Sequence, residues 1–193
     1  MGFGLTDIKG YKFETLCLIP DTWDAVSRDY IEGRESQIVS NYAQYCSIVR
    51  TGIGGASLVI GGEVDAGNTQ GYQFCLFLAA LTAGTVWDRK PDNKDEPINW
   101  VELKTAQDFG ADGNLLTFER KLLKFWIQSF LLGVPKIIVG FRSPDGILKR
   151  VEDFETQKIP GIVKRSGKGS WDGNLCINFA AGFLACTDPL QQR

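Results

Sequence analysis

The sequence predicts an α+β domain, because stretches with strand character and stretches with helix character follow one another along its 193 residues. Short apolar, β-branched runs occur at residues 57–60 and 136–141, whereas residues 116–132 repeat apolar side chains at helical spacing. The composition, 44% hydrophobic and 23% charged, is that of a globular protein with a core. No repeat or composition shift divides the chain, so we expect a single domain over residues 1–193.

The first half of the chain is predicted to contain two strands joined by a turn. Residues 10–19 open the domain and end at a proline–aspartate turn signal. Residues 41–50 have the mixed character of a strand, and the glycine-rich residues 51–56 make a turn. Residues 57–60, Ser-Leu-Val-Ile, are predicted to form a buried strand that runs on toward Glu63.

A loop, a strand and the clearest helix follow. Residues 90–97 are polar and contain two prolines, which indicates a loop, and residues 98–105 are predicted to form the next strand. Residues 116–132 are expected to form a helix with Thr117 as its cap and Gly133 just beyond its end.

The last third is predicted to return to strands and then to a helix. Residues 136–141 form a strand, and residues 143–146, Ser-Pro-Asp-Gly, form a hairpin-type turn that leads into a strand at 147–151. Residues 174–185 are almost wholly apolar, so we expect a final helix in the core.

The amino-acid content excludes several chemistries. The chain has no histidine, which excludes Ser-His-Asp and Cys-His catalysis and every histidine-ligated metal site. Its five cysteines are widely spaced without a CxxC pair, so we expect reduced, buried thiols rather than zinc, and an intracellular protein. The apolar run 74–83 is too short to span a bilayer, and no membrane partner is expected. A net charge of −2 means that contact with RNA would depend on local patches.

Two short triplets carry the strongest chemical signal: Glu63-Val64-Asp65 and Glu102-Leu103-Lys104. In a strand, side chains at i and i+2 point to the same face, so neighbouring strands would bring three carboxylates and one lysine together. Mg²⁺ and Mn²⁺ prefer such oxygen ligands, and a bound divalent ion promotes hydrolysis of phosphate esters. The triplets therefore predict a metal-dependent nuclease in which Lys104 stabilises developing charge. Exposed strand acids and a simple Lys104–Glu102 salt bridge are the plainer alternative.

Two further polar residues are candidates for the site. Glu14 lies among aromatic neighbours and would complete or support the ligand set. Gln128 lies in an apolar run of the long helix, so it either reaches the site or its substrate or lies on the helix surface. With Lys121 and Lys124 it forms a polar stripe, which would lie along a phosphate backbone or face solvent.

Four segments resemble the eukaryotic decapping exoribonuclease family, DXO and its fungal nuclear relatives. They are GYKFE, GGEVDA, INWVELKT and KLLKFWIQSFLLGVPKIIVGFRSPDG, and the similarity runs over residues 10–185. The resemblance implies mixed β-sheets flanked by helices, with the metal site in the cleft between the sheets. It implies a Mg²⁺- or Mn²⁺-dependent hydrolase that removes triphosphate (as pyrophosphate), incomplete caps or NAD caps from RNA 5′ ends, with 5′→3′ exonuclease activity in some members. It also implies a nuclear location and a 5′→3′ exoribonuclease as a possible partner.

The resemblance also implies a role for each motif residue. The implied metal set is Glu14, Glu63, Asp65, Glu102 and Leu103. The implied catalytic residues are Glu63, Asp65, Glu102 and Lys104. The implied substrate contacts are Lys104, Gln128 and Glu14.

The sequence departs from the family pattern in three places. We expect the chain to lack the region before GYKFE, with its substrate-contacting arginine motif, and the strands after the last helix. Residues 67–85 look like an apolar insertion, either an insertion helix or translated intron sequence. These departures leave open a second hypothesis, a catalytically impaired member that binds RNA or an exoribonuclease.

Overall fold

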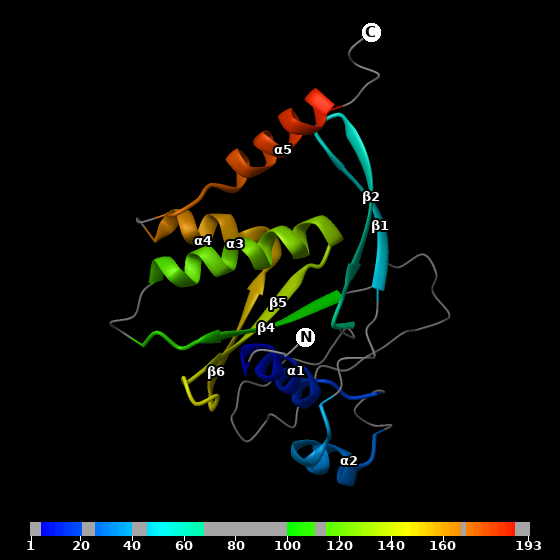
Figure 1. The fold of residues 1–193 in the computed structure, drawn as a ribbon, viewed down its shortest axis with the longest axis vertical. Coiled ribbons are helices and arrows are strands. Elements are labelled where there is room, and N and C mark those ends of the chain that lie inside the picture. The colour runs from blue at the N-terminus through cyan, green and yellow to red at the C-terminus, as the bar shows by residue number, and fades with distance from the viewer. Residues whose placement is uncertain are drawn as a thin grey trace.

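Two β-sheets and the helices around them make up the described part of the chain (Figure 1). The computed structural model describes residues 5–20, 26–39, 46–67, 100–110, 115–166 and 169–187. The helices are α1 (Leu5–Cys17), α2 (Arg28–Glu32), α3 (Leu115–Leu132), α4 (Ile159–Arg165) and α5 (Gly173–Thr187), with short 3₁₀ turns η1 (Gly33–Ser36) and η3 (Thr156–Lys158). The strands are β1 (Cys46–Ile53), β2 (Ala56–Glu63), β3 (Ala66–Gly67), β4 (Trp100–Gln107), β5 (Lys136–Arg142) and β6 (Leu148–Glu155).

The larger sheet has the strand order β3-β4-β5-β6 and is mixed. Strands β4 and β5 run parallel and are connected by a crossover that contains α3, whereas β3 and β6 are antiparallel to their neighbours. The smaller sheet is the antiparallel hairpin β1-β2, which turns at Gly54 with a positive φ of 58°. This arrangement confirms the predicted α+β class.

Helices cover both faces of the larger sheet (Figure 1). On one face, α3 packs the side chains of Leu122 and Trp126 against β4 and β5. On the other face, α1 packs Phe13 against the sheet, and Gly140 of β5 lets its ring come close. A Cβ atom at Gly140 would lie 2.6 Å from Cε2 of Phe13. The close approach fixes α1, and with it Glu14, against the sheet.

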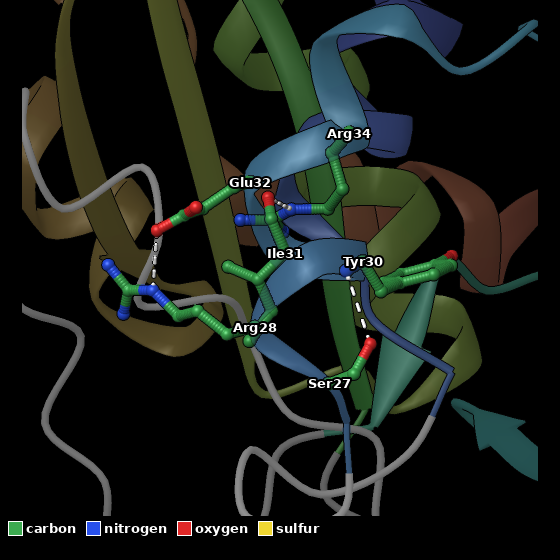
Figure 2. Close-up of polar contacts among 6 residues, drawn as sticks. All are labelled: Ser27, Arg28, Tyr30, Ile31, Glu32 and Arg34. Atoms are coloured by element: carbon green, nitrogen blue, oxygen red, sulfur yellow. Dashed lines mark hydrogen bonds and ion pairs between the residues drawn. The ribbon is translucent and has the colours of Figure 1, made fainter.

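Polar contacts tie the segment after α1 back to that helix. Ser27 caps α2 by accepting the backbone N–H of Tyr30 at 3.2 Å, and the buried Arg34 donates from Nε to the carbonyl of Ile31 at 3.1 Å (Figure 2). From α1, Lys12 Nζ donates to the backbone carbonyl of Glu35 at 2.7 Å. The α2–η1 segment therefore braces the helix that carries Glu14.

Helix α5 is correctly predicted as a helix, but the prediction that it belongs to the core is wrong. Three large side chains at i, i+4 and i+8 are exposed: Leu175 at 69%, Phe179 at 76% and Phe183 at 60%. The helix rests on the β1–β2 turn at Gly54, beside Ala181, and no element of the described chain covers its apolar stripe. Apolar composition alone did not reveal which side of the helix has a partner.

The structure also differs from the predictions in where two strands end and in how buried the cysteines are. Strand β1 runs through residue 53 because only Gly54 and Gly55 make the turn, and β6 continues to residue 155 because it pairs along all of β5. Of the four described cysteines, Cys17 is buried, Cys176 is partly buried, and Cys46 and Cys186 are exposed, so the expected burial is wrong for Cys46 and Cys186. Residues 41–45 and 90–97, and the proposed insertion beyond residue 67, lie outside the described residues. None of the helices in the described ranges is long and apolar enough to cross a membrane.

Candidate metal centre

Strand β4 brings Glu102 and Lys104 together. The two residues alternate with Val101 and Leu103, whose side chains pack on the α1 face, so Glu102 and Lys104 lie on the opposite face. Their side chains form an ion pair, although Glu102 is only 1% exposed. The strand prediction for this triplet is confirmed, and the salt bridge of the plainer alternative is present.

Asp65 is held against the same strand by a backbone contact. One of its carboxylate oxygens accepts the N–H of Leu103 at 2.7 Å. In the register of β3 and β4, Ala66 lies opposite Val101, so Asp65 precedes the first paired residue. The carboxylate of Asp65 thus accepts the Leu103 N–H where a paired strand would offer a backbone carbonyl. This contact holds Asp65 beside Glu102.

The first triplet is not a continuous strand, which corrects the sequence prediction. Strand β2 ends at Glu63, and Val64 and Asp65 form the link between the hairpin and β3 of the larger sheet. Val64 is buried with Trp100 in the cluster that fixes this link. Glu63 and Asp65 are brought to one region because the chain passes from one sheet to the other there, and not because of strand alternation.

Helix α3 helps to hold the end of β2. A Cβ atom at Gly62 would lie 2.6 Å from Cδ1 of Leu132, so a side chain at residue 62 would require Leu132 to shift. Leu132 belongs to the same buried cluster as Val64. The last turn of α3 therefore sets the position of Glu63, which follows Gly62 directly.

The electrostatics show that four acids share this region. The pKa of Glu102 is raised to about 7, chiefly by burial and also by the neighbouring Asp65, against the lowering effect of Lys104. The pKa of Glu14 is likewise raised to about 7, chiefly by burial and next by Asp65, while Lys104 works against the rise. The pKa values of Asp65 and Glu63 are also raised, chiefly by burial. One lysine does not neutralise four carboxyl groups, so the region favours an additional cation.

Lys104 responds in the opposite way. Burial by itself lowers the pKa of an ammonium group, but the carboxylates of Glu102, Asp65 and Glu14 outweigh it and raise the pKa of Lys104. Lys104 therefore stays protonated beside the acids, and it is suited to attract negative charge rather than to accept a proton.

The residues fit a hard divalent cation in donor type. Apart from the ion pair with Lys104, neither carboxylate oxygen of the buried Glu102 has a hydrogen-bond partner in the described part of the chain. Carboxylate oxygens are the ligands that Mg²⁺ and Mn²⁺ bind. As the side chains stand, however, no group of three acids, histidines or cysteines among the described residues is drawn together tightly enough to hold an ion.

The other predicted residues lie around this centre. The side chain of Leu103 is buried with Phe13, so only its backbone carbonyl could reach an ion. Gln128 is exposed on α3, which agrees with the helix-surface alternative; it stands one turn before Leu132 on the same side of the helix. Sequence reasoning placed Glu14 without recognising its helix, although Phe13 and Cys17 already had the i, i+4 spacing of a buried helix face.

One cavity lies close by but does not contain the acids. It has a volume of about 670 Å³, lies at the start of β4 and β5, and is lined by side chains that include Trp100, Ser129 and Lys136. None of Glu14, Glu63, Asp65 and Glu102 lines it. The acids lie instead where the hairpin joins the larger sheet.

Comparison with known proteins identifies a family for this chain. The family model described as RAI1 like PD-(D/E)XK nuclease matches residues 5–189. The (D/E)XK part of that description is an acid, any residue and a lysine, which is the pattern of Glu102-Leu103-Lys104. The decapping nuclease RAI1 of Emericella nidulans is 57% identical over 175 residues, which cover 91% of this chain and 44% of the relative. The chain thus spans less than half the length of this curated relative.

Solved structures give the same picture. The structure of Candida albicans Rai1 in complex with pU5 and Mn²⁺ matches with a TM-score of 0.66 and 44% identity, covering 80% of this chain and 35% of that one. The structure of a mutant S. pombe Rai1 in complex with 3′-FADP matches with a TM-score of 0.63 and 32% identity, covering 93% of this chain and 48% of that one.

The S. pombe protein carries substitutions at three glutamates. Their spacing along that chain agrees, to within one residue, with the spacing of Glu14, Glu63 and Glu102. The segment between Glu63 and Glu102, which holds residues 67–85, therefore has nearly the length found in that relative. That residues 67–85 are an insertion stays a prediction.

Proposed function

The chain belongs to the RAI1-like PD-(D/E)XK nuclease family, and from this premise we propose that it acts as a divalent-metal-dependent hydrolase on RNA 5′ ends. The observation that carries the proposal is the gathering of Glu14, Glu63, Asp65 and Glu102 around Lys104. The agreement in spacing with the three glutamates replaced in S. pombe Rai1 supports the same residues. The likeness to the Candida albicans protein, whose structure holds pU5 and Mn²⁺, supports RNA and a divalent ion as the ligands.

The four acids would hold one or two Mg²⁺ or Mn²⁺ ions, with the carbonyl of Leu103 as a further oxygen donor. When bound, such ions lower the pKa of a coordinated water and neutralise charge on a phosphoryl group. Glu102 is buried, and apart from its ion pair with Lys104 its carboxylate has no hydrogen-bond partner in the described part of the chain.

The remaining residues position the substrate. Lys104 stays cationic beside the acids, where it would attract a non-bridging phosphoryl oxygen and stabilise charge that develops there. Gln128 is exposed on the side of α3 that leads to Gly62, and its amide would contact the first nucleotides. Glu14 approaches from α1 and would orient groups from the other side of the centre.

The finer assignment extends this proposal. The substrates would be 5′-triphosphate RNA, from which pyrophosphate is released, and RNA with incomplete caps or NAD caps, with 5′→3′ exonuclease activity as a further possibility to measure. A nuclear 5′→3′ exoribonuclease is the proposed partner, and the nucleus is the proposed location.

An end-specific assay tests this function. RNAs of identical sequence that carry a 5′ triphosphate, an unmethylated cap or an NAD cap are incubated with the chain and Mn²⁺ or Mg²⁺, and the released 5′ group is identified by mass. We expect release that stops in EDTA and in Glu63→Ala and Asp65→Ala. Release that persists in both variants would overturn the assignment.

The acids of the described residues are not close enough together to hold an ion as they stand. This favours a second candidate function, a family member that binds RNA or an exoribonuclease but does not hydrolyse RNA. Such a protein would bind a 5′-triphosphate RNA whether or not a divalent ion is present, and would release no product in the assay above. Product release by the wild-type chain decides between the two.

A further inference from the structure

The exposed side of α3 carries a cationic stripe that the hydrolytic centre does not use. Lys121 and Lys124 are exposed, and none of the ion pairs found in the described part of the chain includes either of them. The helix has one acidic residue, Glu119, and that residue is buried. The outer surface of α3 is therefore positive although the whole chain has a net charge of −2.

The inward position of Glu119 is fixed by hydrogen bonds. Its two carboxylate oxygens accept the hydroxyl of Ser166 at 2.6 Å and the backbone N–H of Ser170 at 3.2 Å. Glu119 is thus committed to holding the segment after α4 and does not compensate the lysines. Arg120, one residue further on, is exposed and adds to the positive surface.

The positive charges lie close together at some cost to the helix. Lys121 and Lys124 are at i, i+3, and Arg120 and Lys124 are at i, i+4. Like charges at these spacings on a helix repel each other and destabilise it. No acidic side chain stands three or four residues away on the outer surface to offset this repulsion. An anion bound along the helix would remove it.

The stripe leads to the metal centre. Gln128 follows Lys121 by seven residues and Lys124 by four, and Leu132 follows Gln128 by a further turn on the same side of the helix. Leu132 packs against Gly62, the residue before Glu63. At 1.5 Å per residue, Lys121 lies about 16 Å along the helix axis from this contact, which is the scale of a few nucleotides.

We infer that Lys121 and Lys124 bind the phosphates of an RNA strand downstream of its 5′ end, so that α3 guides the strand away from the acids. This inference rests on the proposed function, because it assumes that an RNA 5′ end occupies the metal centre. A single strand leaving that centre is repelled by the acids around Lys104, and the stripe offers it regularly spaced cations in the direction of α3. The contacts are to phosphate, so they favour long RNA over short RNA without selecting a base sequence.

The test compares RNA lengths. Affinities of the wild-type chain and of Lys121→Gln/Lys124→Gln are measured by fluorescence anisotropy for a 5′-phosphorylated dinucleotide and decanucleotide, with Ca²⁺ as the divalent ion and gel analysis to confirm intact RNA. We expect the double variant to lose affinity for the decanucleotide. A plot of the logarithm of its association constant against the logarithm of the salt concentration should also be less steep by about 1.4, since each phosphate contact to a single strand contributes about 0.7. Lys149→Gln, which removes an exposed lysine of β6, is the matched control and should bind both RNAs as wild type.

The outcomes are distinct. Equal affinity of wild type and double variant for the decanucleotide, or no preference of the wild type for it over the dinucleotide, would overturn the inference. An acidic peptide of the same charge that displaces the labelled decanucleotide as well as unlabelled decanucleotide does would overturn the inference in favour of a protein ligand. Failure of the hydrolase function looks different: no RNA yields product with Mg²⁺ or Mn²⁺, while the length-dependent binding and its loss in the double variant persist.

Discussion

The carboxylate of Asp65 accepts the backbone N–H of Leu103 at 2.7 Å, and this contact joins the two acidic motifs of the chain. Leu103 lies between Glu102 and Lys104, so Asp65 is fixed next to their ion pair. The contact has a structural part, which satisfies a buried N–H, and an electrostatic part, which adds a negative charge beside Glu102. The two parts can be separated by substitution.

Asp65→Asn should preserve the structural part and remove the electrostatic part. The amide oxygen can still accept the N–H of Leu103, so we expect the free energy of unfolding without divalent ions to stay within about 0.5 kcal/mol of wild type or to increase. Asp65→Ala leaves a buried N–H without a partner and should cost about 1–3 kcal/mol. Urea denaturation of both variants measures the difference, and an equal loss in the two would show that the hydrogen bond is not what holds Asp65.

Removing Lys104 should expose the cost of burying Glu102. Lys104→Met leaves a carboxylate that is 1% exposed without its counterion, and we expect a loss of about 3 kcal/mol at pH 8. The loss should be smaller at pH 5, because the pKa of Glu102 is already raised to about 7 and the neutral acid needs no counterion. The double variant Lys104→Met/Glu102→Gln should recover most of the stability. A double-mutant cycle with no coupling between the two positions would contradict the buried ion pair.

Gly140→Ala should displace α1. The new Cβ would meet the ring of Phe13, which is buried in the core, and we expect a loss of about 1–3 kcal/mol together with weaker Mn²⁺ binding through Glu14. Gly10→Ala in the same helix is the matched control, because no atom of the described residues lies within 4 Å of its added Cβ. That change should stabilise the chain by about 0.5–1 kcal/mol, as alanine does within a helix. Thermal unfolding gives both values, and a harmless Gly140→Ala would mean that α1 is not packed as described.

Stability without divalent ions should fall as pH rises. Glu14 and Glu102 have pKa values of about 7 in the folded chain, against an ordinary value of 4.5, so the folded state binds more protons between these limits. Ionisation therefore favours the unfolded state, and the free energy of unfolding should decrease from pH 4.5 to about 7. Denaturation in EDTA across this range measures the slope, which Glu14→Gln/Glu102→Gln should flatten. A wild-type stability that rises with pH over this window, or a slope unchanged in the double variant, would argue against the acid cluster.

The sequence predicted which acidic and lysine side chains lie near one another better than it predicted the backbone structure that places them there. Strand alternation correctly placed Glu102 and Lys104 on one face of β4, because both residues lie within a single strand. The same rule failed for Glu63 and Asp65, because β2 ends at Glu63 and the chain then changes sheets. Where a strand ends depends on its partner: β2 pairs with β1 up to Cys46 and Glu63, and neither residue signals this locally.

The other features that the sequence did not predict depend on contacts between residues far apart in the chain. The contact between Asp65 and Leu103 and that between Gly62 and Leu132 join residues far apart in sequence, and no local pattern indicates them. The exposure of Phe179 on α5 was missed because an apolar helix predicts burial, whereas burial depends on what packs against each side.

The most direct test is titration of the intact chain with Mn²⁺ at pH 8. Binding is measured by isothermal titration calorimetry and by the electron paramagnetic resonance signal of the free ion. If Glu63, Asp65 and Glu102 surround a divalent ion, the wild-type chain should bind one or two Mn²⁺ per molecule, and Glu63→Gln/Asp65→Asn/Glu102→Gln should bind none there while remaining folded. Wild-type binding that is absent, or that matches the folded triple variant, would contradict the assignment of these acids to a metal centre.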